Sequence, residues 1–406
     1  MTAPDIPRHR DRTDARSNTW LLALSLLLIA CNLRPVFGSL SVVLPEIMRD
    51  TGLSATGASM LTTLPILCLG LFSAPAPWLA RRFGAERVLL LALALIVAGT
   101  LLRAAGSLAL LFASAVLAGA GIALANVLLP GLIKRCFPLK TALMMGLYTL
   151  AVCAGASSAA AFTVPLEQHW FDYDWAHALA FWALPAAAAF MIWAPQAWRA
   201  APVATDPAAH AGSLLRDRLA WQVTLFMGLQ SALAYIVMGW LAPILRERGI
   251  DSATAGYLVA ASILTQLMTS LFTPPLAARL RDQRVLALVL CLLTAAAFLG
   301  LMWGPLGTPM WLWSIALGMG QGGTFALALS LIVMRSGNAH VTAQLSAMAQ
   351  GWGYVLAACG PLLVGLLRGA TGSYVSVAWL VLVYGALTAA AGWGAGRKLL
   401  VQPRSA

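Results

Sequence analysis

The chain has 406 residues, of which 60% are hydrophobic and only 10% are charged, a balance that excludes an ordinary water-soluble enzyme or binding domain. Its formal net charge of +12 is spread over short basic segments between apolar runs, which does not indicate a nucleic-acid partner. We therefore expect an all-α polytopic membrane protein that has the lipid bilayer as a partner.

Twelve apolar runs are long enough to cross a membrane. A hydrocarbon core about 30 Å thick needs roughly 20 residues of helix, and polar or turn residues separate the runs. The predicted helices cover 18–45, 53–80, 85–104, 107–131, 141–164, 176–198, 219–245, 253–278, 285–304, 308–334, 342–366 and 373–396.

The polar sequence Asn32-Leu33-Arg34-Pro35 interrupts the first predicted helix. Arg34 is the one basic residue that falls well inside a predicted span, where a guanidinium costs at least about 2.5–3.5 kcal/mol. The proline cannot donate to the carbonyl of Cys31, so we expect a kink that leaves this acceptor free. We predict that Arg34 and Asn32 bind substrate. The alternative is a structural role, in which Arg34 binds carbonyl and amide groups between helices.

The chemistry of Arg34 suggests a class of ligand. All fourteen Asp and Glu residues fall in loops or at the ends of predicted spans, so the sequence offers no carboxylate at the midplane as a partner. A fixed positive charge with a planar fork of donors suits an anion or a strongly polar acceptor such as a nitro group.

The loop after the second predicted helix carries Arg81, Arg82 and Arg87 around Gly84. It resembles the Gly-x-x-x-Asp-Arg-x-Gly-Arg/Lys motif of major facilitators, but Pro77 replaces the glycine and Arg81 replaces the aspartate. We therefore do not expect this chain to form the salt bridge that the motif's aspartate makes. Arg82 is a candidate gating residue, and a basic loop that only sets the topology is the alternative.

Further polar side chains lie inside later spans. Asn126, in the fourth predicted helix, can both donate and accept a hydrogen bond, and Pro130 marks a bend one turn later. Each such residue alone is more often a contact between helices than a ligand, but together they predict a cavity lined by amides and aromatic rings around one cation. The other substrate-binding candidates are Tyr148, Gln230, Tyr235, Gln321 and Trp352.

The two halves of the chain repeat each other. An offset of 197 residues places Gly52 on Gly249, Pro77 on Pro274 and Arg82 on Arg279, with further matches around them. Each unit has six helices, so both enter the membrane from the same side, which is typical of the parallel halves of major facilitators. The predicted domains are a six-helix bundle over 1–198, a cytoplasmic linker over 199–218 and a second six-helix bundle over 219–406.

Basic residues predict the orientation, because positive charge stays on the cytoplasmic side of short loops. Twenty of the 26 Lys and Arg residues fall on the side of the two termini. Both termini are therefore predicted to be cytoplasmic. Five basic residues fall on the other side: Arg49, Arg103, Arg246, Arg248 and Arg368.

No pattern indicates an enzyme, a metal site or a cofactor. The five histidines lack metal-ligand spacing, and the six cysteines, without a CxxC pair, are expected to be free thiols. Glycine pairs such as Gly119-Ala-Gly121 and Gly318-Met-Gly320 lie inside apolar spans without a preceding strand. We interpret them as close helix contacts and hinges rather than phosphate-binding loops.

One family resemblance becomes specific at these residues. Asn32-Leu-Arg34-Pro35 with Ser41-x-x-Leu-Pro45, and the helix-4 sequence from Asn126 to Arg135, resemble the cyanate permease and 2-nitroimidazole transporter family of the major facilitator superfamily. The resemblance covers essentially the whole chain. It implies transport of a small anionic or nitro-bearing solute across the bacterial inner membrane, with Arg34 and Asn126 in the substrate site.

The energy source stays open. Glu46, at the outer end of the first helix, is the nearest acid to the span, so a proton that travels with the substrate or protonates Glu46 is one hypothesis. Facilitated diffusion or exchange without a proton is the other. We expect a monomeric secondary active transporter; the alternatives are a drug or nitroaromatic efflux permease and a membrane sensor without transport.

Overall fold

The computed structural model describes residues 10–199 and 214–401, and these ranges form helices without a strand. Twelve helices or helix pairs are long and apolar enough to cross a membrane. The prediction of twelve spans and of an all-α polytopic fold is confirmed. Residues 200–213 of the predicted linker, together with Arg8 and Arg404 of the basic segments, lie outside the described residues.

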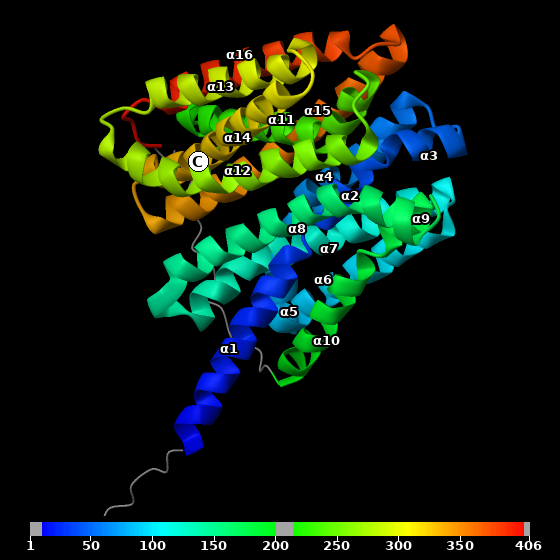
Figure 1. The fold of residues 1–406 in the computed structure, drawn as a ribbon. Helices are drawn as coiled ribbons and strands as arrows, with labels where there is room; N and C mark the ends of the chain where they lie inside the picture. Colours follow the sequence, from blue (N-terminus) through cyan, green and yellow to red (C-terminus); the bar gives the residue numbers. More distant parts are fainter. Residues whose placement is uncertain (1–9, 200–213, 402–406) are drawn as a thin grey trace, which may run out of the picture.

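The helices form two groups that lie against each other (Figure 1). The first half comprises α1 (Arg10–Cys31), α2 (Pro35–Val42), α3 (Leu44–Thr51), α4 (Ala55–Ser73), α5 (Ala76–Phe83), α6 (Ala85–Leu101), η1 (Leu102–Ala105), α7 (Leu108–Cys136), η2 (Pro138–Lys140), α8 (Thr141–Trp170), α9 (Trp175–Ala180) and α10 (Ala183–Arg199). The second half comprises α11 (Arg218–Glu247), α12 (Ser252–Arg279), α13 (Arg284–Trp303), α14 (Thr308–Met334), α15 (Ala339–Thr371) and α16 (Val375–Ala395).

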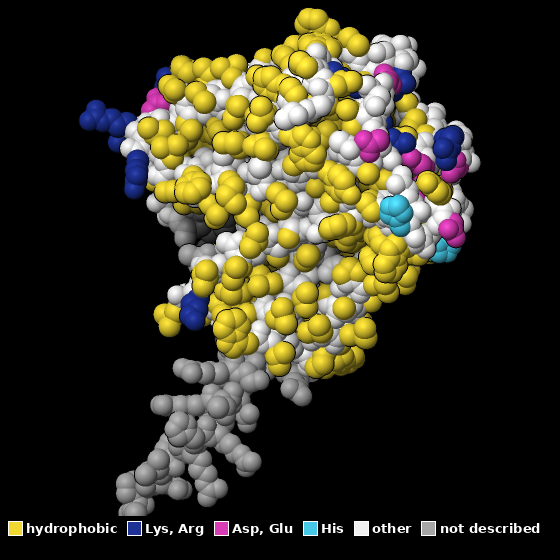
Figure 2. Space-filling view, in the orientation of Figure 1, with side chains coloured by type: hydrophobic (Ala, Val, Ile, Leu, Met, Phe, Trp, Pro, Cys, Tyr) yellow, Lys and Arg dark blue, Asp and Glu magenta, His cyan; other side chains and the backbone are white. Residues whose placement is uncertain are grey.

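Two sides of the bundle follow from this order. The terminal side holds the start of α1, the end of α16 and the loop 137–140, and the far side holds the loops 171–174 and 248–251. Between them, the surface in Figure 2 is largely apolar, and charged side chains gather toward the two ends. An apolar belt between charged rims is the surface that a bilayer requires.

The first predicted helix is broken more completely than a kink. Helix α1 ends at Cys31, and α2 restarts with Pro35 in its first turn, where the missing proline N–H costs nothing. Arg34 is the residue before this proline, with φ −120° and ψ −15° and no side-chain cap. The guanidinium therefore starts from a helix break inside the span.

The helices differ from the predicted ones on both sides of the bundle. On the terminal side, α1 begins at Arg10, the second predicted helix is divided into α4 and α5, and α7 continues to Cys136. The fifth predicted helix, 141–164, continues to Trp170 as α8, so Glu167 lies inside a helix rather than in a loop. The sixth, 176–198, is divided into α9 and α10 around Phe181 and Trp182. Helix α9 packs on η1 and on α8, and a hydropathy pattern does not contain such contacts between segments.

Glycines allow the helices to pack closely, as predicted for the glycine pairs. A Cβ on Gly318 would lie 2.0 Å from the carbonyl oxygen of Ser262, and a Cβ on Gly121 would lie 2.4 Å from that of Ala92. All six cysteines are free thiols, also as predicted.

We expect Gly318→Ala to destabilise the protein by about 1–3 kcal/mol, because α12 and α14 must separate to admit the methyl group. Gly146→Ala is the matched control, since a Cβ at this helical position meets nothing within 4 Å. Thermal unfolding of the detergent-purified proteins measures both. Equal melting temperatures for the two variants would contradict the tight contact.

The halves meet mainly along three pairs of helices: α4 with α15, α8 with α12, and α2 with α11. Glycines again mark close approaches, since a Cβ on Gly365 would lie 2.2 Å from the Cβ of Ser59, and a Cβ on Gly256 would lie 2.5 Å from the carbonyl oxygen of Ala160. Both approaches lie in the far-side part of the bundle. The interface between the halves is therefore tightly packed on the far side.

Candidate functional site

Arg34 reaches from the break between α1 and α2 to the second half. Its guanidinium donates a 2.8 Å hydrogen bond to the hydroxyl oxygen of Tyr235 on α11. It also lies 5.7 Å from the ring centre of Phe37 and 5.5 Å from that of Tyr235, within range of cation–π attraction. The hydrogen-bond partner is a neutral phenol. Among the described residues, no carboxylate lies within ion-pair distance of Arg34.

Aromatic rings enclose the guanidinium. The ring centres of Phe37 and Tyr235 are 5.7 Å apart, and those of Tyr235 and Tyr354 are 6.4 Å apart. Tyr148 and Tyr354 also lie within electrostatic range of Arg34. These side chains come from α2, α8, α11 and α15, so both halves of the fold contribute to one site.

Asn126 adds hydrogen-bonding capacity beside this cluster. The hydroxyl of Tyr148 donates to its Oδ1 over 3.5 Å, a long hydrogen bond. Its Nδ2 is buried and has no hydrogen-bond partner among the described residues. An unused buried donor is costly, so Nδ2 is suited to bind an acceptor that enters the site.

The remaining predicted substrate residues make contacts elsewhere. The amide of Asn32 donates to the carbonyl oxygens of Leu28 and Pro185, and thus ties α1 to α10. Trp352 is 55% exposed and packs on Trp221 near the terminal-side end of α11, with ring centres 6.3 Å apart. The structure does not bring these two side chains to the Arg34 cluster.

The two predicted glutamines are buried in the second half. Gln321 accepts a hydrogen bond from Gln266 and donates to the carbonyl oxygen of Leu233, so it braces the segment of α11 that carries Tyr235. Gln230 donates to the carbonyl oxygen of Met227 and to the hydroxyl of Ser231, whereas its Oε1 has no partner among the described residues.

A narrow apolar pocket lies next to the Arg34 cluster, toward the far side of the bundle. It has room for about one water molecule. Its walls come from both halves of the fold. They consist of Val36, Phe37, Leu40, Thr62, Pro65, Ile66, Tyr235, Met238 and Gly239.

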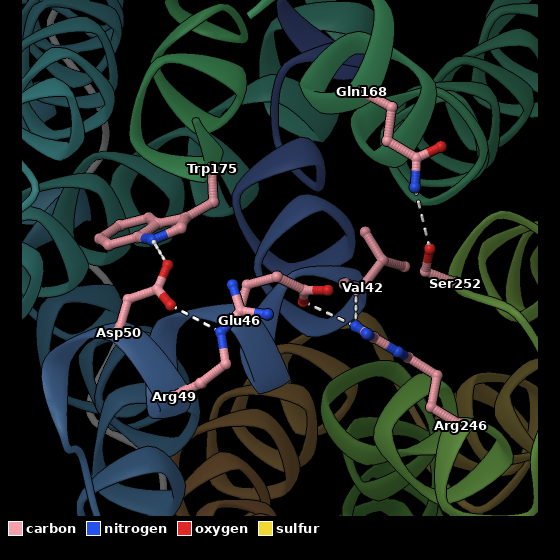
Figure 3. Close-up of polar contacts among 8 residues, drawn as sticks. All are labelled: Val42, Glu46, Arg49, Asp50, Gln168, Trp175, Arg246 and Ser252. Carbon is pink, nitrogen blue, oxygen red and sulfur yellow. Dashed lines mark hydrogen bonds and ion pairs between the residues drawn. The ribbon is translucent and has the colours of Figure 1, made fainter. Parts of the chain in front are cut away.

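Glu46, the predicted coupling residue, lies on the far side and links the halves. Arg246 of α11 forms a 2.6 Å ion pair with Glu46 of α3 and donates to the carbonyl oxygen of Val42 (Figure 3). Gln168 of α8 donates to Ser252 of α12 across the same interface, over 3.2 Å. These contacts fasten the two halves together on the far side, and we call them the far-side latch.

Two acids and two bases in this region are already paired. Besides the pair of Glu46 with Arg246, Arg49 donates to Asp50 over 2.7 Å, and the ring N–H of Trp175 donates to the same carboxylate (Figure 3). The hydrogen bond from Arg49 lowers the pKa of Asp50 below its ordinary value, because it stabilises the charged form.

Arg82, the predicted gating residue, lies on the terminal side at the end of α5. Its guanidinium lies over the rings of Trp78 and Phe83, at 5.5 and 5.4 Å from their centres. The neighbouring Glu86 is paired with Arg135 of α7. Both contacts stay within the first half, so a gating role for Arg82 remains a prediction.

Arg103, at the end of the third predicted helix and counted with the basic residues of the far side, is 1% exposed. Its guanidinium donates to the carbonyl oxygen of Val36 and to the hydroxyls of Ser39 and Ser114. Arg103 thus supports α2 directly after the helix break. The signal in the sequence was its position at the edge of an apolar run. A buried guanidinium needs hydrogen-bond acceptors, and Val36, Ser39 and Ser114 supply them.

Comparisons with known proteins agree with this architecture. The family model described as "Major Facilitator Superfamily" matches residues 22–361. The chain is 39% identical to the 2-nitroimidazole transporter of Escherichia coli (strain K12), over 94% of this chain and 96% of that protein. It is 32% identical to the cyanate transport protein CynX of the same organism, over 87% and 91% of the two chains.

Among solved structures, the D-xylose–proton symporter is similar, with a TM-score of 0.71 over 95% of this chain and 98% of that one. The sequence identity is 14%, so this likeness concerns the fold alone.

Proposed function

We infer that this chain, which belongs to the Major Facilitator Superfamily and is a membrane transporter, moves a small anionic or nitro-bearing solute by alternating access. The two halves, 1–198 and 219–406, rock against each other around a solute at the Arg34 cluster. The positive charge of the loops supports a cytoplasmic terminal side. The bacterial transporters among the relatives support the bacterial inner membrane as the location. The latch on the far side then corresponds to an inward-facing arrangement.

The observation that carries the proposal is a cation between the halves whose hydrogen-bond partner is a neutral phenol. A charged side chain inside the membrane is costly and usually has a function. The planar guanidinium can donate two parallel hydrogen bonds to two oxygen atoms of one ligand. Without a solute, the hydroxyl oxygen of Tyr235 accepts the hydrogen bond from Arg34. An oxygen atom of a bound anion or nitro group would accept it instead.

Asn126 and Tyr148 extend the proposed site. The free Nδ2 of Asn126 and the hydroxyl of Tyr148 would donate to the same solute, and the aromatic rings would bind a flat molecule on its faces. The names of the relatives, a 2-nitroimidazole transporter and a cyanate transport protein, describe solutes of this size and polarity.

Export of cationic drugs is the competing function. A site for cations needs an acid close to the solute, and the described residues place no carboxylate in contact with Arg34. This arrangement favours an anion over a cation.

Uptake into proteoliposomes tests the function. We expect labelled cyanate or 2-nitroimidazole to enter vesicles that contain the purified protein faster than protein-free vesicles, and unlabelled solute to compete. Competition by a lipophilic cation, without competition by either solute, would overturn the proposal in favour of drug transport.

The same vesicles test proton coupling. If a proton travels with the solute, an inward proton gradient should increase the initial rate of uptake. A rate that is independent of the imposed gradient would support diffusion or exchange without a proton.

A further inference from the structure

Glu167 is an acid that the transport site does not use. It lies on α8, close to the far-side end of the helix, and is only 3% exposed. Its backbone carbonyl accepts a hydrogen bond from the N–H of Tyr173. Its carboxyl group has no hydrogen bond and no ion pair with any residue that the structure describes.

The charges around Glu167 do not balance it. Glu46, Arg49 and Asp50 on α3 and Arg246 on α11 all lie within electrostatic range of its carboxyl group. The two guanidinium groups are already engaged, Arg246 with Glu46 and Arg49 with Asp50. Glu167 is thus a third acid in a cluster with two bases.

The other titratable groups on this side do not neutralise it either. His169, on the same helix, is exposed, and His177 on α9 is paired with Asp174 at 2.6 Å. At the start of α12, Ser252 accepts the hydrogen bond from Gln168, and the capping residue Asp251 is a further acid rather than a cation. The surroundings therefore offer Glu167 no free cation.

Closure of the latch makes the charge on Glu167 expensive. The carboxyl oxygens of Glu167 keep little contact with water and have no partner among the described residues, a setting in which the charged form is less stable than the neutral acid. Opening on the far side would admit water to α8 and rehydrate the carboxylate, whereas Arg246, which would leave with the second half, is already paired with Glu46. The charged form of Glu167 therefore fits the open arrangement and the neutral form fits the closed one.

We propose that Glu167 takes up a proton from the far-side solution when the latch closes and returns it to the same solution when the latch opens. Acid on the far side thereby shifts the population toward the closed arrangement. Because the proton goes back to the side from which it came, this step regulates the gate and does not by itself drive transport. The proposal rests on the alternating access of the proposed function but not on the identity of the solute.

Spin-label distances in nanodiscs test the proposal without any substrate. The six native cysteines are first replaced, and labels are attached at Trp170→Cys and Leu306→Cys, two exposed far-side positions in different halves. Between about pH 8 and about pH 5, we expect the short-distance population of the otherwise native protein to grow, with a ratio of closed to open molecules that changes by at most about tenfold per pH unit.

Glu167→Gln imitates the neutral acid, so its short-distance population should be large and independent of pH. Glu167→Ala should also lose the pH dependence and serves if the glutamine variant does not fold. Glu247→Gln is the matched control, because Glu247 is a far-side acid whose ion pair, with Arg368, stays within the second half. This control should keep the native pH dependence.

A distance distribution that is the same at every pH in the native background would overturn the proposal, as would full pH dependence in Glu167→Gln. Solute uptake by the same preparations reports separately on the proposed function. A protein that transports neither cyanate nor 2-nitroimidazole but keeps a Glu167-dependent change in distance would contradict the proposed solute class and still support the proposed gate.

Discussion

Arg34→Ala protein is expected to fold and insert normally but to lose uptake of its solute. A hydrogen bond to a charged group contributes about 1.5–3 kcal/mol, so the loss of one such contact lowers affinity by about 10-fold to 150-fold, and a two-pronged contact loses more. Ligand-induced stabilisation in a thermal-shift assay and initial rates of cyanate and 2-nitroimidazole uptake measure the effect.

Two further variants separate binding from a structural role of Arg34. Arg34→Lys keeps the charge but removes the planar fork, so we expect weakened but detectable binding. Tyr235→Phe removes the 2.8 Å hydrogen bond between Arg34, in the break before α2, and α11, and it leaves the charge in place. Binding should therefore survive in Tyr235→Phe. Equal stabilisation of the native protein and Arg34→Ala by the ligand would return Arg34 to a structural role.

Reversal of one charge in the latch is expected to open the far side. Arg246→Glu would face Glu46 with a second acid and add to the charge around Glu167. The side chains of Arg246 and Glu46 are 24% and 13% exposed, so loss of the pair should cost the closed arrangement about 1–2 kcal/mol, and the new repulsion adds to this. The ratio of closed to open molecules should then fall by at least about tenfold.

The exchange variant, Glu46→Arg with Arg246→Glu, should recover part of the closed population because it rebuilds the pair with the charges inverted. The labels at Trp170→Cys and Leu306→Cys measure the distance in all these proteins. Arg368→Gln is the control, since its ion pair with Glu247 does not cross between the halves. If Arg368→Gln opened the far side as much as Arg246→Glu does, a change in surface charge would explain the opening. The ion pair between the halves would then not be its cause.

The proposed transport site was predictable in part. Arg34 could be identified because an arginine within an apolar run is a local anomaly, and Asn126 because its amide lies in another such run. Their neighbours were less certain. Of the proposed substrate residues, Asn32 is directed to the carbonyl oxygen of Pro185, and Trp352 packs on Trp221. The hydropathy of a span does not tell how the helix is rotated about its axis. The sequence therefore cannot decide which polar residues face the site and which face another helix.

By itself, the sequence determined the twelve spans and an interruption at Pro35, although it predicted a kink rather than a full break, because the bilayer imposes a length and a polarity on each segment separately. Only the tertiary structure decided that Tyr235, 201 residues away, is the partner of Arg34, and that Arg103 and Glu167 are buried. This contact and the burial of these two residues depend on which helices pack together and on how each helix is rotated about its axis. Packing between distant segments sets both, so no single segment of the chain contains them.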